Sequence, residues 1–252
     1  MTDLTRTDNE IRFLARTSTN GEELCGLLVK STEGLVVVQI PNRASEPKTA
    51  YRLDDKEYLH WYARGEIWGV WHTHPVGSAG WSQADLAVAE AVAFPQVLYE
   101  CEPDKFSYWT PNGFRAPLVE RYYCSEIHDC YACVRDAVER ITNDSFPDLD
   151  RRTLNNRGGL PEAHQLWEPM GFAIAYRPRT GRVAVLSIQA EGLPNHLGFM
   201  VRDDQMLHHA FESQSEVVTH IGFWRAVTLF YLRHEKIEAA LGECEEIDAW
   251  KL

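Results

Sequence analysis

The sequence lacks an apolar run that approaches the roughly 20 residues needed to span a membrane. Its start, Met1 to Asn20, mixes charged and polar side chains without an uninterrupted apolar stretch, so we do not expect a secretory signal peptide. Internal repeats and low-complexity tracts are also missing. The composition, 44% hydrophobic and 25% charged, is typical of a globular protein, and we expect it to fold in a cytoplasm.

The sequence offers no cysteine pattern of a disulfide scaffold, and it has fewer basic than acidic residues. The 6 cysteines, at positions 25, 101, 124, 130, 133 and 244, do not indicate a disulfide framework in a reducing compartment. Only 25 Lys and Arg stand against 37 Asp and Glu, which leaves a net charge of −12. Since a polyanion would be repelled on average, nucleic acid is not an expected partner.

With 252 residues, the chain is long enough for two domains of ordinary size. Strand-like runs at 24–29, 34–40, 66–72, 97–101 and 105–109 alternate with a helical run at 82–93. The periodicity lapses between Thr110 and Arg121, where Pro and Gly interrupt the pattern, so we divide the chain into domains 1–115 and 116–252. The second half places a helix at 130–142 before strands at 171–176, 182–189, 197–201 and 205–210, which favours the α+β class.

A candidate metal site lies in the first half, in the segment His72-Thr-His74-Pro75. Residues two apart on a strand point to the same face, so the two histidines can converge on one ion. Six residues after Pro75, the segment Ser82-Gln-Ala-Asp85 would add a carboxylate from the next helix. Three protein ligands with one open position are typical of a catalytic zinc. The alternative is that Ser82 and Asp85 only form a helix cap.

A general base is also needed, and Glu23 is our candidate, with Glu22 as its rival. Together these segments resemble the JAMM (MPN+) metallopeptidases, whose pattern is a Glu, then His-x-His-Pro, six residues, and Ser-x-x-Asp. The resemblance covers roughly residues 8 to 110. It implies that His72, His74 and Asp85 bind Zn²⁺, that Glu23 is the base, and that Ser82 helps to hold the oxyanion.

A candidate thiol nucleophile, Cys130, opens the helix of the second half. The apolar positions of this helix form one stripe, which should turn Cys130 toward the buried side. A thiolate at a helix N-terminus is stabilised by the helix dipole. Two other interpretations remain: a structural zinc cluster of Cys124, His128, Cys130 and Cys133, or a Cys130 that is only a small core residue.

The thiolate would need a histidine, and His196 starts a predicted strand. The returning strand carries His208 and His209. A hairpin loop with an odd number of residues would place His196 directly opposite His208, whereas an even loop would pair it with His209. Periodicity alone leaves this register open.

Asp129-Cys130 at a helix start, then His196-x-Gly-Phe, then a polar residue twelve positions after His196, resembles the NlpC family of papain-like cysteine peptidases. The match covers roughly residues 117 to 235. It implies that Cys130 is the nucleophile, His196 the base and His208 the residue that orients the base. It departs from the family just before the cysteine, where Ser125-Glu126-Ile127 replaces the usual Gly.

The two motif sets in one short chain resemble a family of tail assembly proteins of lambda-like phages. That resemblance implies a bifunctional hydrolase, made in the host cytoplasm and carried at the virion tail tip. Its partners would be other tail-tip proteins, and its substrate the peptide stems of peptidoglycan. Two alternatives are a structural tail-tip component with vestigial sites and an assembly protease that processes a tail protein.

Overall fold

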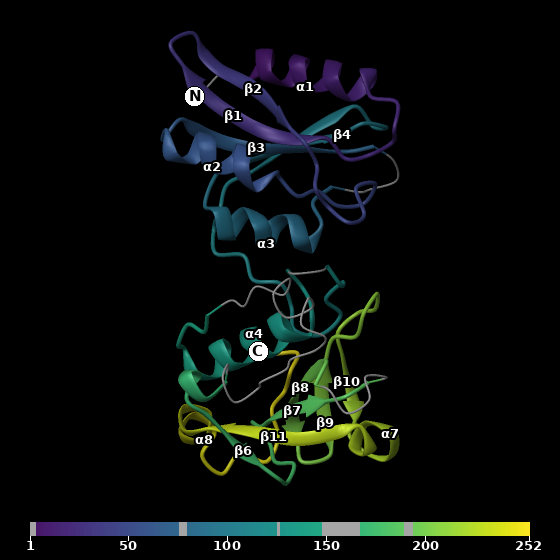
Figure 1. Ribbon diagram of the computed structural model, residues 1–252, viewed down its shortest axis with the longest axis vertical. Coiled ribbons are helices and arrows are strands. Elements are labelled where there is room, and N and C mark those ends of the chain that lie inside the picture. Colours follow the sequence, from purple (N-terminus) through teal and green to yellow (C-terminus); the bar gives the residue numbers. More distant parts are fainter. Residues whose placement is uncertain (1–3, 76–79, 125–126, 148–166, 189–193) are drawn as a thin grey trace. The chain divides into compact units, whose positions relative to one another are not determined.

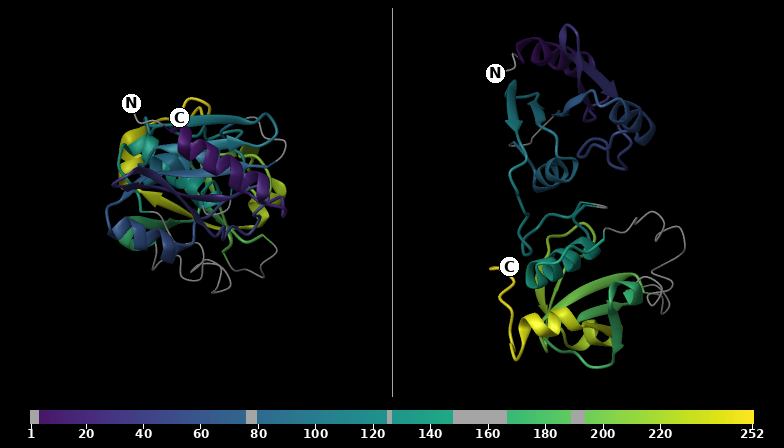
Figure 2. Two further views of the ribbon diagram at one scale, coloured as in Figure 1. Left: turned by 90° about the horizontal axis from the view of Figure 1, so that it is seen from above. Right: turned by 90° about the vertical axis from the view of Figure 1, so that its left-hand side faces the viewer.

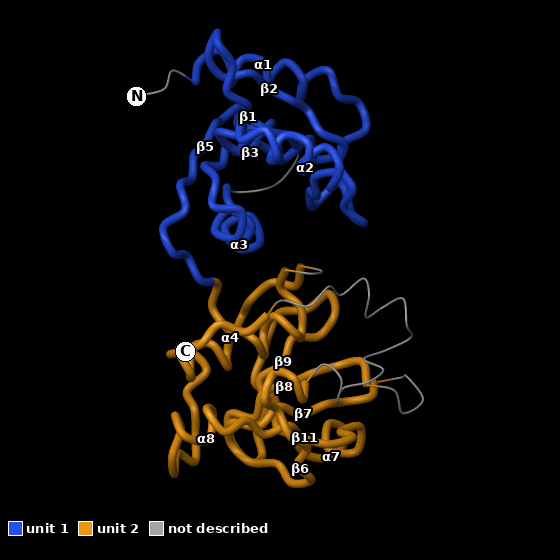
Figure 3. Tube along the Cα trace, turned by 60° about the vertical axis from the view of Figure 1, so that its left-hand side comes forward, with its two compact units in different colours: residues 1–115 blue, residues 116–252 orange. Residues whose placement is uncertain are grey.

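The protein forms two compact units, Met1–Arg115 and Ala116–Leu252, which Figure 3 shows in different colours. The computed structural model describes residues 4–75, 80–124, 127–147, 167–188 and 194–252. Each unit combines helices with its own sheet, so the predicted two-domain α+β class is confirmed. Within the described ranges, no helix is both long and apolar enough to cross a membrane.

The first unit is a five-stranded sheet with helices on both faces. Its elements, in chain order, are α1 (Thr5–Thr17), β1 (Cys25–Ser31), β2 (Gly34–Ile40), α2 (Asp55–Ala63), β3 (Ile67–His74), α3 (Gln83–Val92), β4 (Gln96–Glu100) and β5 (Lys105–Trp109). The strand order is β2-β1-β3-β4-β5. Only β3 and β4 are parallel, because α3 provides the crossover that a parallel pair requires.

The strands of this unit are apolar on both sides because both sides are covered. Leu28 packs with Ile11 of α1, whereas its neighbour Leu27 packs in a second cluster beneath α2. Figures 1 and 2 show α1 on one face of the sheet and α2 and α3 on the other. Val70 of β3 belongs to the cluster beneath α2, and alternation along the strand directs His72 and His74 to the same face.

The second unit is an antiparallel sheet of six strands with a helix before it. Its elements are α4 (Cys130–Thr142), the 3₁₀ turn η1 (Glu168–Met170), β6 (Phe172–Ala175), β7 (Val183–Leu186), β8 (His196–Arg202), β9 (Gln205–His208), β10 (Glu216–Thr219), α7 (Gly222–Ala226), β11 (Thr228–His234) and α8 (Glu235–Leu241). The strand order is β10-β9-β8-β7-β11-β6. The last two strands and the two short helices were not predicted. Gln189, at the end of one predicted strand, lies outside the described residues.

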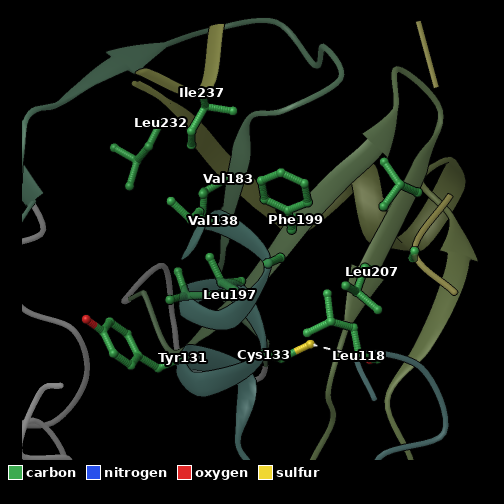
Figure 4. Close-up of a cluster of buried hydrophobic side chains, with 14 of the residues drawn as sticks. Leu118, Tyr131, Cys133, Val138, Val183, Leu197, Phe199, Leu207, Leu232 and Ile237 are labelled. Atoms are coloured by element: carbon green, nitrogen blue, oxygen red, sulfur yellow. Dashed lines mark hydrogen bonds between the residues drawn. The ribbon is translucent and has the colours of Figure 1, made fainter. Parts of the chain in front are cut away.

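The core of the second unit joins α4 to the sheet. Val134 and Val138 of α4 pack in one cluster with Leu197 and Phe199 of β8 and Leu207 of β9 (Figure 4). Asp129 is the N-cap of this helix, and its carboxylate accepts the backbone N–H of Ala132 at 2.8 Å. This cap fixes where α4 starts, and therefore fixes Cys130 at its first position.

Candidate active sites

Three side chains of the first unit meet at a buried point below the sheet. The Nε2 atoms of His72 and His74 are 3.2 Å apart. Asp85, from α3, has Oδ1 at 3.4 Å from the Nε2 of His72 and Oδ2 at 3.5 Å from the Nε2 of His74. Among the described residues, this is the only group of three or more His, Cys, Asp or Glu side chains placed to hold a metal ion.

These separations suit a zinc ion. Ligand atoms at about 2.0–2.1 Å from a tetrahedral centre lie about 3.3 Å from one another. The three measured separations, 3.2, 3.4 and 3.5 Å, fall around that value. Two imidazoles and one carboxylate also form a donor set that zinc accepts, and a fourth position is left for a small molecule. The residues therefore fit the metal that the sequence motif implies.

Asp85 serves as a helix cap and a site residue at once. Ser82 and Asp85 form a reciprocal capping box: the Asp85 N–H donates to the Ser82 Oγ at 3.1 Å, and the Ser82 N–H donates to the Asp85 Oδ2 at 2.8 Å. The two interpretations of the Ser-x-x-Asp pattern are thus compatible. The cap holds the Asp85 carboxylate in place before any ion arrives.

Glu23 lies beside this group, just before β1. Its Oε1 is 3.8 Å from the Nε2 of His74, and its side chain is buried. The adjacent Leu24 is fastened to Thr73 through its own N–H, which donates to the Thr73 Oγ1 at 2.9 Å. Glu22 is half-buried and accepts a hydrogen bond from Asn20 instead. The structure therefore places Glu23, and not Glu22, next to the histidines.

The carboxylates of this site have strongly perturbed acidities. Burial raises the pKa of Glu23 to about 7, partly offset by the charge of His74. Burial alone would also raise the pKa of Asp85, but the neighbouring His72 and His74 together hold that pKa well below its usual value. Two acids that approach the same histidine, His74, thus differ in proton affinity, which is a property of sites that divide acid and base roles.

Aromatic rings that the sequence motif does not include also surround His72. The ring of Tyr51 is stacked on the imidazole, with centroids 4.3 Å apart and an interplanar angle of 23°. Trp81 meets the same imidazole edge-on at 5.7 Å. Both lie outside regular elements, and no local pattern marks them. They could not be identified without the tertiary structure.

In the second unit, His196 and His208 contact each other directly. The Nε2 of His196 is 3.1 Å from the Nδ1 of His208, and both rings are buried. Trp224 of α7 packs on the pair, with its ring centroid 4.5 Å from that of His208 and 6.3 Å from that of His196. Burial, with the charge of His208 adding to it, lowers the pKa of His196 to about 3. Burial also lowers the pKa of His208 to about 4.

The register of this hairpin differs from both alternatives that the sequence left open. His208 is the cross-strand partner of Gly198, so His196 lies diagonal to it on the same face and not directly opposite. The loop has two residues, Asp203 and Asp204, an even number that was expected to select His209. A register shift between Met200 and Arg202 adds one residue to β8 and reverses the parity.

Cys130 begins α4, and α4 packs on the strands that carry His196 and His208. Cys130 is only half-buried, less than the apolar stripe predicted. Cys133 is the fully buried cysteine of this helix, with its Sγ 3.9 Å from the Leu118 carbonyl oxygen (Figure 4). Since the described residues place no ion-binding group at this helix, the structural zinc cluster is not supported. Ser125 and Glu126 lie outside the described residues.

Comparison with known proteins supports the motif of the first unit. Residues 9–117 match the prokaryotic homologs of the JAB domain. The chain is similar to tail tip assembly protein K of Escherichia phage N15, with 23% identity over 222 residues that cover 85% of this chain and 89% of the relative. Protein K of Escherichia phage lambda is 25% identical over 191 residues, which cover 75% of this chain and 92% of the relative. The first unit is JAB-like, and the predicted resemblance to phage tail assembly proteins is confirmed.

Solved structures resemble only part of the chain. A protein from Desulfitobacterium hafniense is 22% identical, covers 41% of this chain and 77% of its own, and has a TM-score of 0.34. A protein from Salinibacter ruber is 23% identical, covers 45% of this chain and 83% of its own, and has a TM-score of 0.32. TM-scores of this size do not establish a shared fold.

Proposed function

We propose that this protein acts at a phage tail tip and carries two hydrolase sites. The first is a zinc-dependent peptidase or isopeptidase in the first unit, and the second is an NlpC-type cysteine peptidase in the second unit. The observation that carries the proposal is the spacing of His72, His74 and Asp85, three buried ligands with separations of 3.2 to 3.5 Å. A buried acid, Glu23, lies beside them.

In the first site, a bound zinc ion would polarise a carbonyl group and lower the pKa of a water molecule. Glu23, whose carboxylate lies beside His74, would accept the proton of the attacking water and pass it to the leaving amine. The hydroxyl of Ser82 accepts the Asp85 N–H, and its own hydrogen would be donated to the oxyanion. The capping box would hold both side chains in place for this task.

In the second site, the Cys130 thiolate would attack an amide carbonyl carbon. His196 would have taken the thiol proton and would return it to the leaving amine, which leaves an acyl-enzyme. Water, losing a proton to His196, would then release the acid and regenerate the thiol. His208, hydrogen-bonded to His196, would orient the base. The helix dipole at the start of α4 would favour the thiolate.

The proposed substrate of the second site is the peptide stem of peptidoglycan, as the NlpC resemblance implies. The similarity to tail tip assembly protein K supports other tail-tip proteins as partners and a place at the tail tip. Synthesis in the host cytoplasm is part of the same proposal. A second candidate function follows from the same names, because both relatives are called assembly proteins. In that case the chain would process a tail protein or serve as a structural component with vestigial sites.

Zymography on purified cell wall distinguishes these functions. We expect a lytic band from the full chain that Cys130→Ala abolishes and His72→Ala leaves intact, since the two sites lie in different units. Cleavage of a co-expressed tail protein without wall lysis would indicate the assembly protease. Absence of both activities, in a protein that assembles into tails, would indicate the structural role.

A further inference from the structure

Tyr51 contacts His72, one of the three residues that could hold a metal ion in the first unit. Tyr51 lies between β2 and α2, where it packs against the apolar cluster that contains Leu27, Ile40 and Val70. Its ring is therefore anchored in the core of the unit. The same ring is stacked on the His72 imidazole at 4.3 Å, which is closer than the edge contact of Trp81 at 5.7 Å.

Among the described residues, none makes to His72 the hydrogen bond that usually orients a metal-binding histidine. Such a residue binds the ion through one ring nitrogen and donates its other N–H to a carbonyl, a carboxylate or water. Here Nε2 faces His74 and Asp85, which leaves Nδ1 for that purpose. Nδ1 is buried and has no hydrogen-bond partner among the residues that the structure describes.

The hydroxyl of Tyr51 is not what fastens this ring. It is buried as well, and the described part of the chain offers it no hydrogen-bond partner either. What remains is the face of the ring, stacked within 23° of parallel to the imidazole. Rotation of His72 about its side-chain bonds would bring the imidazole into the Tyr51 ring, so the stack restricts the orientation of Nε2.

We infer that Tyr51 is a positioning residue of the metal site, and that its ring face takes the place of the missing hydrogen bond to His72. This inference rests on the proposed zinc site of the first unit. It assigns the effect to the aromatic ring and not to the phenolic hydroxyl. The two can be separated by substitution, because Tyr51→Phe keeps the ring and Tyr51→Leu removes it.

The test is zinc affinity of the purified full chain, measured by competition with a chromophoric chelator. Tyr51→Phe should bind zinc within about twofold of the unchanged protein, and Tyr51→Leu should bind about tenfold or more weakly, the usual effect of losing an outer partner. Tyr58→Leu is the matched control, since Tyr58 packs in the same cluster and stacks on Tyr62 instead of a histidine. It should leave the affinity unchanged.

Three results would overturn the inference. Equal weakening by Tyr51→Phe and Tyr51→Leu would assign the effect to the hydroxyl, and unchanged affinity in Tyr51→Leu would show that the ring is not needed. Equal weakening by Tyr58→Leu would make the effect one of general packing. If Tyr51→Leu does not fold, Tyr51→Met, whose flexible side chain fills irregular space, is judged by the same criterion. An unchanged protein that binds no zinc would refute the proposed site itself.

Discussion

The Nε2 of His196 lies 3.1 Å from the Nδ1 of His208, although the direct cross-strand partner of His208 is Gly198. The two histidines meet across a diagonal of the hairpin, on one face of the sheet. His209 is held elsewhere, with its Nε2 3.1 Å from the Ser213 carbonyl oxygen and its ring edge-on to Tyr123. One inserted residue in β8 therefore decides which histidine joins His196.

The thiol chemistry can be tested by alkylation with iodoacetamide near pH 7. We expect Cys130 to react faster than Cys133, because burial raises the pKa of Cys133 to about 12. His196→Ala should slow alkylation of Cys130 by roughly 10-fold or more, because no neighbouring base would then take the thiol proton. His208→Ala should have a smaller effect and His209→Ala almost none.

The exposed Cys244 provides the internal reference for this experiment, because its rate should not change in any histidine variant. If His209→Ala slows the alkylation of Cys130 as much as His196→Ala does, the register of the β8–β9 hairpin is off by one residue in solution. Equal labelling of Cys130 and Cys133 would indicate a site without thiolate chemistry.

Metal content tests the first site. We expect one zinc per chain, lost in His72→Ala and in His74→Ala because two remaining ligands cannot hold an open tetrahedral site. Mass spectrometry of the native protein and elemental analysis would measure it. His60→Ala, on the surface of α2, is the matched control and should keep the metal. Full peptidase activity in metal-free protein would refute the zinc mechanism.

Glu23→Gln separates metal binding from catalysis. The substitution leaves the three ligands in place and removes only the proton acceptor, so zinc content should stay at one per chain while turnover of a JAMM substrate falls by roughly 10²-fold or more. Glu22→Gln is the control, because Glu22 bonds to Asn20 and not to the site. A fully active Glu23→Gln, or an inactive Glu22→Gln, would show that the base is misassigned.

Acid should destabilise the second unit. Burial lowers the pKa of His128 and of His196 to about 3, and that of His208 to about 4. In the unfolded chain each takes up a proton near pH 6.5. Between these pH values the unfolded state binds more protons, so the free energy of unfolding falls as pH drops below 6.5. The loss approaches about 1.4 kcal/mol per histidine for each pH unit.

Urea unfolding of the full chain at pH 7.5, 6 and 5, followed by hydrogen exchange of peptides from β8 and β9, measures this slope. His128→Gln should reduce the pH dependence of the free energy of unfolding by the contribution of one histidine. If the hydrogen-exchange protection of these peptides is the same at pH 7.5 and at pH 5, the assignment of neutral, buried histidines is contradicted.

Insertion of a recognition site for a specific protease between the two units tests whether they fold independently. Arg115 is exposed, whereas Arg121 is fully buried and donates from Nη2 to the Ala116 carbonyl oxygen at 2.9 Å. On the other side, the Gly113 N–H donates to Glu90 of the first unit at 2.9 Å. Cleavage at a site inserted after Arg115 should release two fragments that keep their circular dichroism and melting transitions. The same site inserted after Ile141, inside α4, should resist cleavage, and loss of structure in either fragment would refute independent folding.

The sequence by itself determined the features that depend on neighbours along the chain. Alternation along β3 places His72 and His74 on one face, and the polar run between apolar segments marks where α3 begins. The Asp129 cap determines where α4 starts, and so puts Cys130 in its first turn. The two-domain α+β class follows from the order of such local segments.

Only the tertiary structure decided the relations between distant segments. The sequence already favoured Glu23 and, through the NlpC resemblance, His208. The approach of Glu23 to His74, and the bulge that brings His208 against His196, are set by the tertiary structure. Tyr51 reaches His72 from a loop with no motif of its own. Local sequence specifies turns and faces, whereas register and packing are set by the free energy of burying whole elements against one another, which no short window of sequence contains.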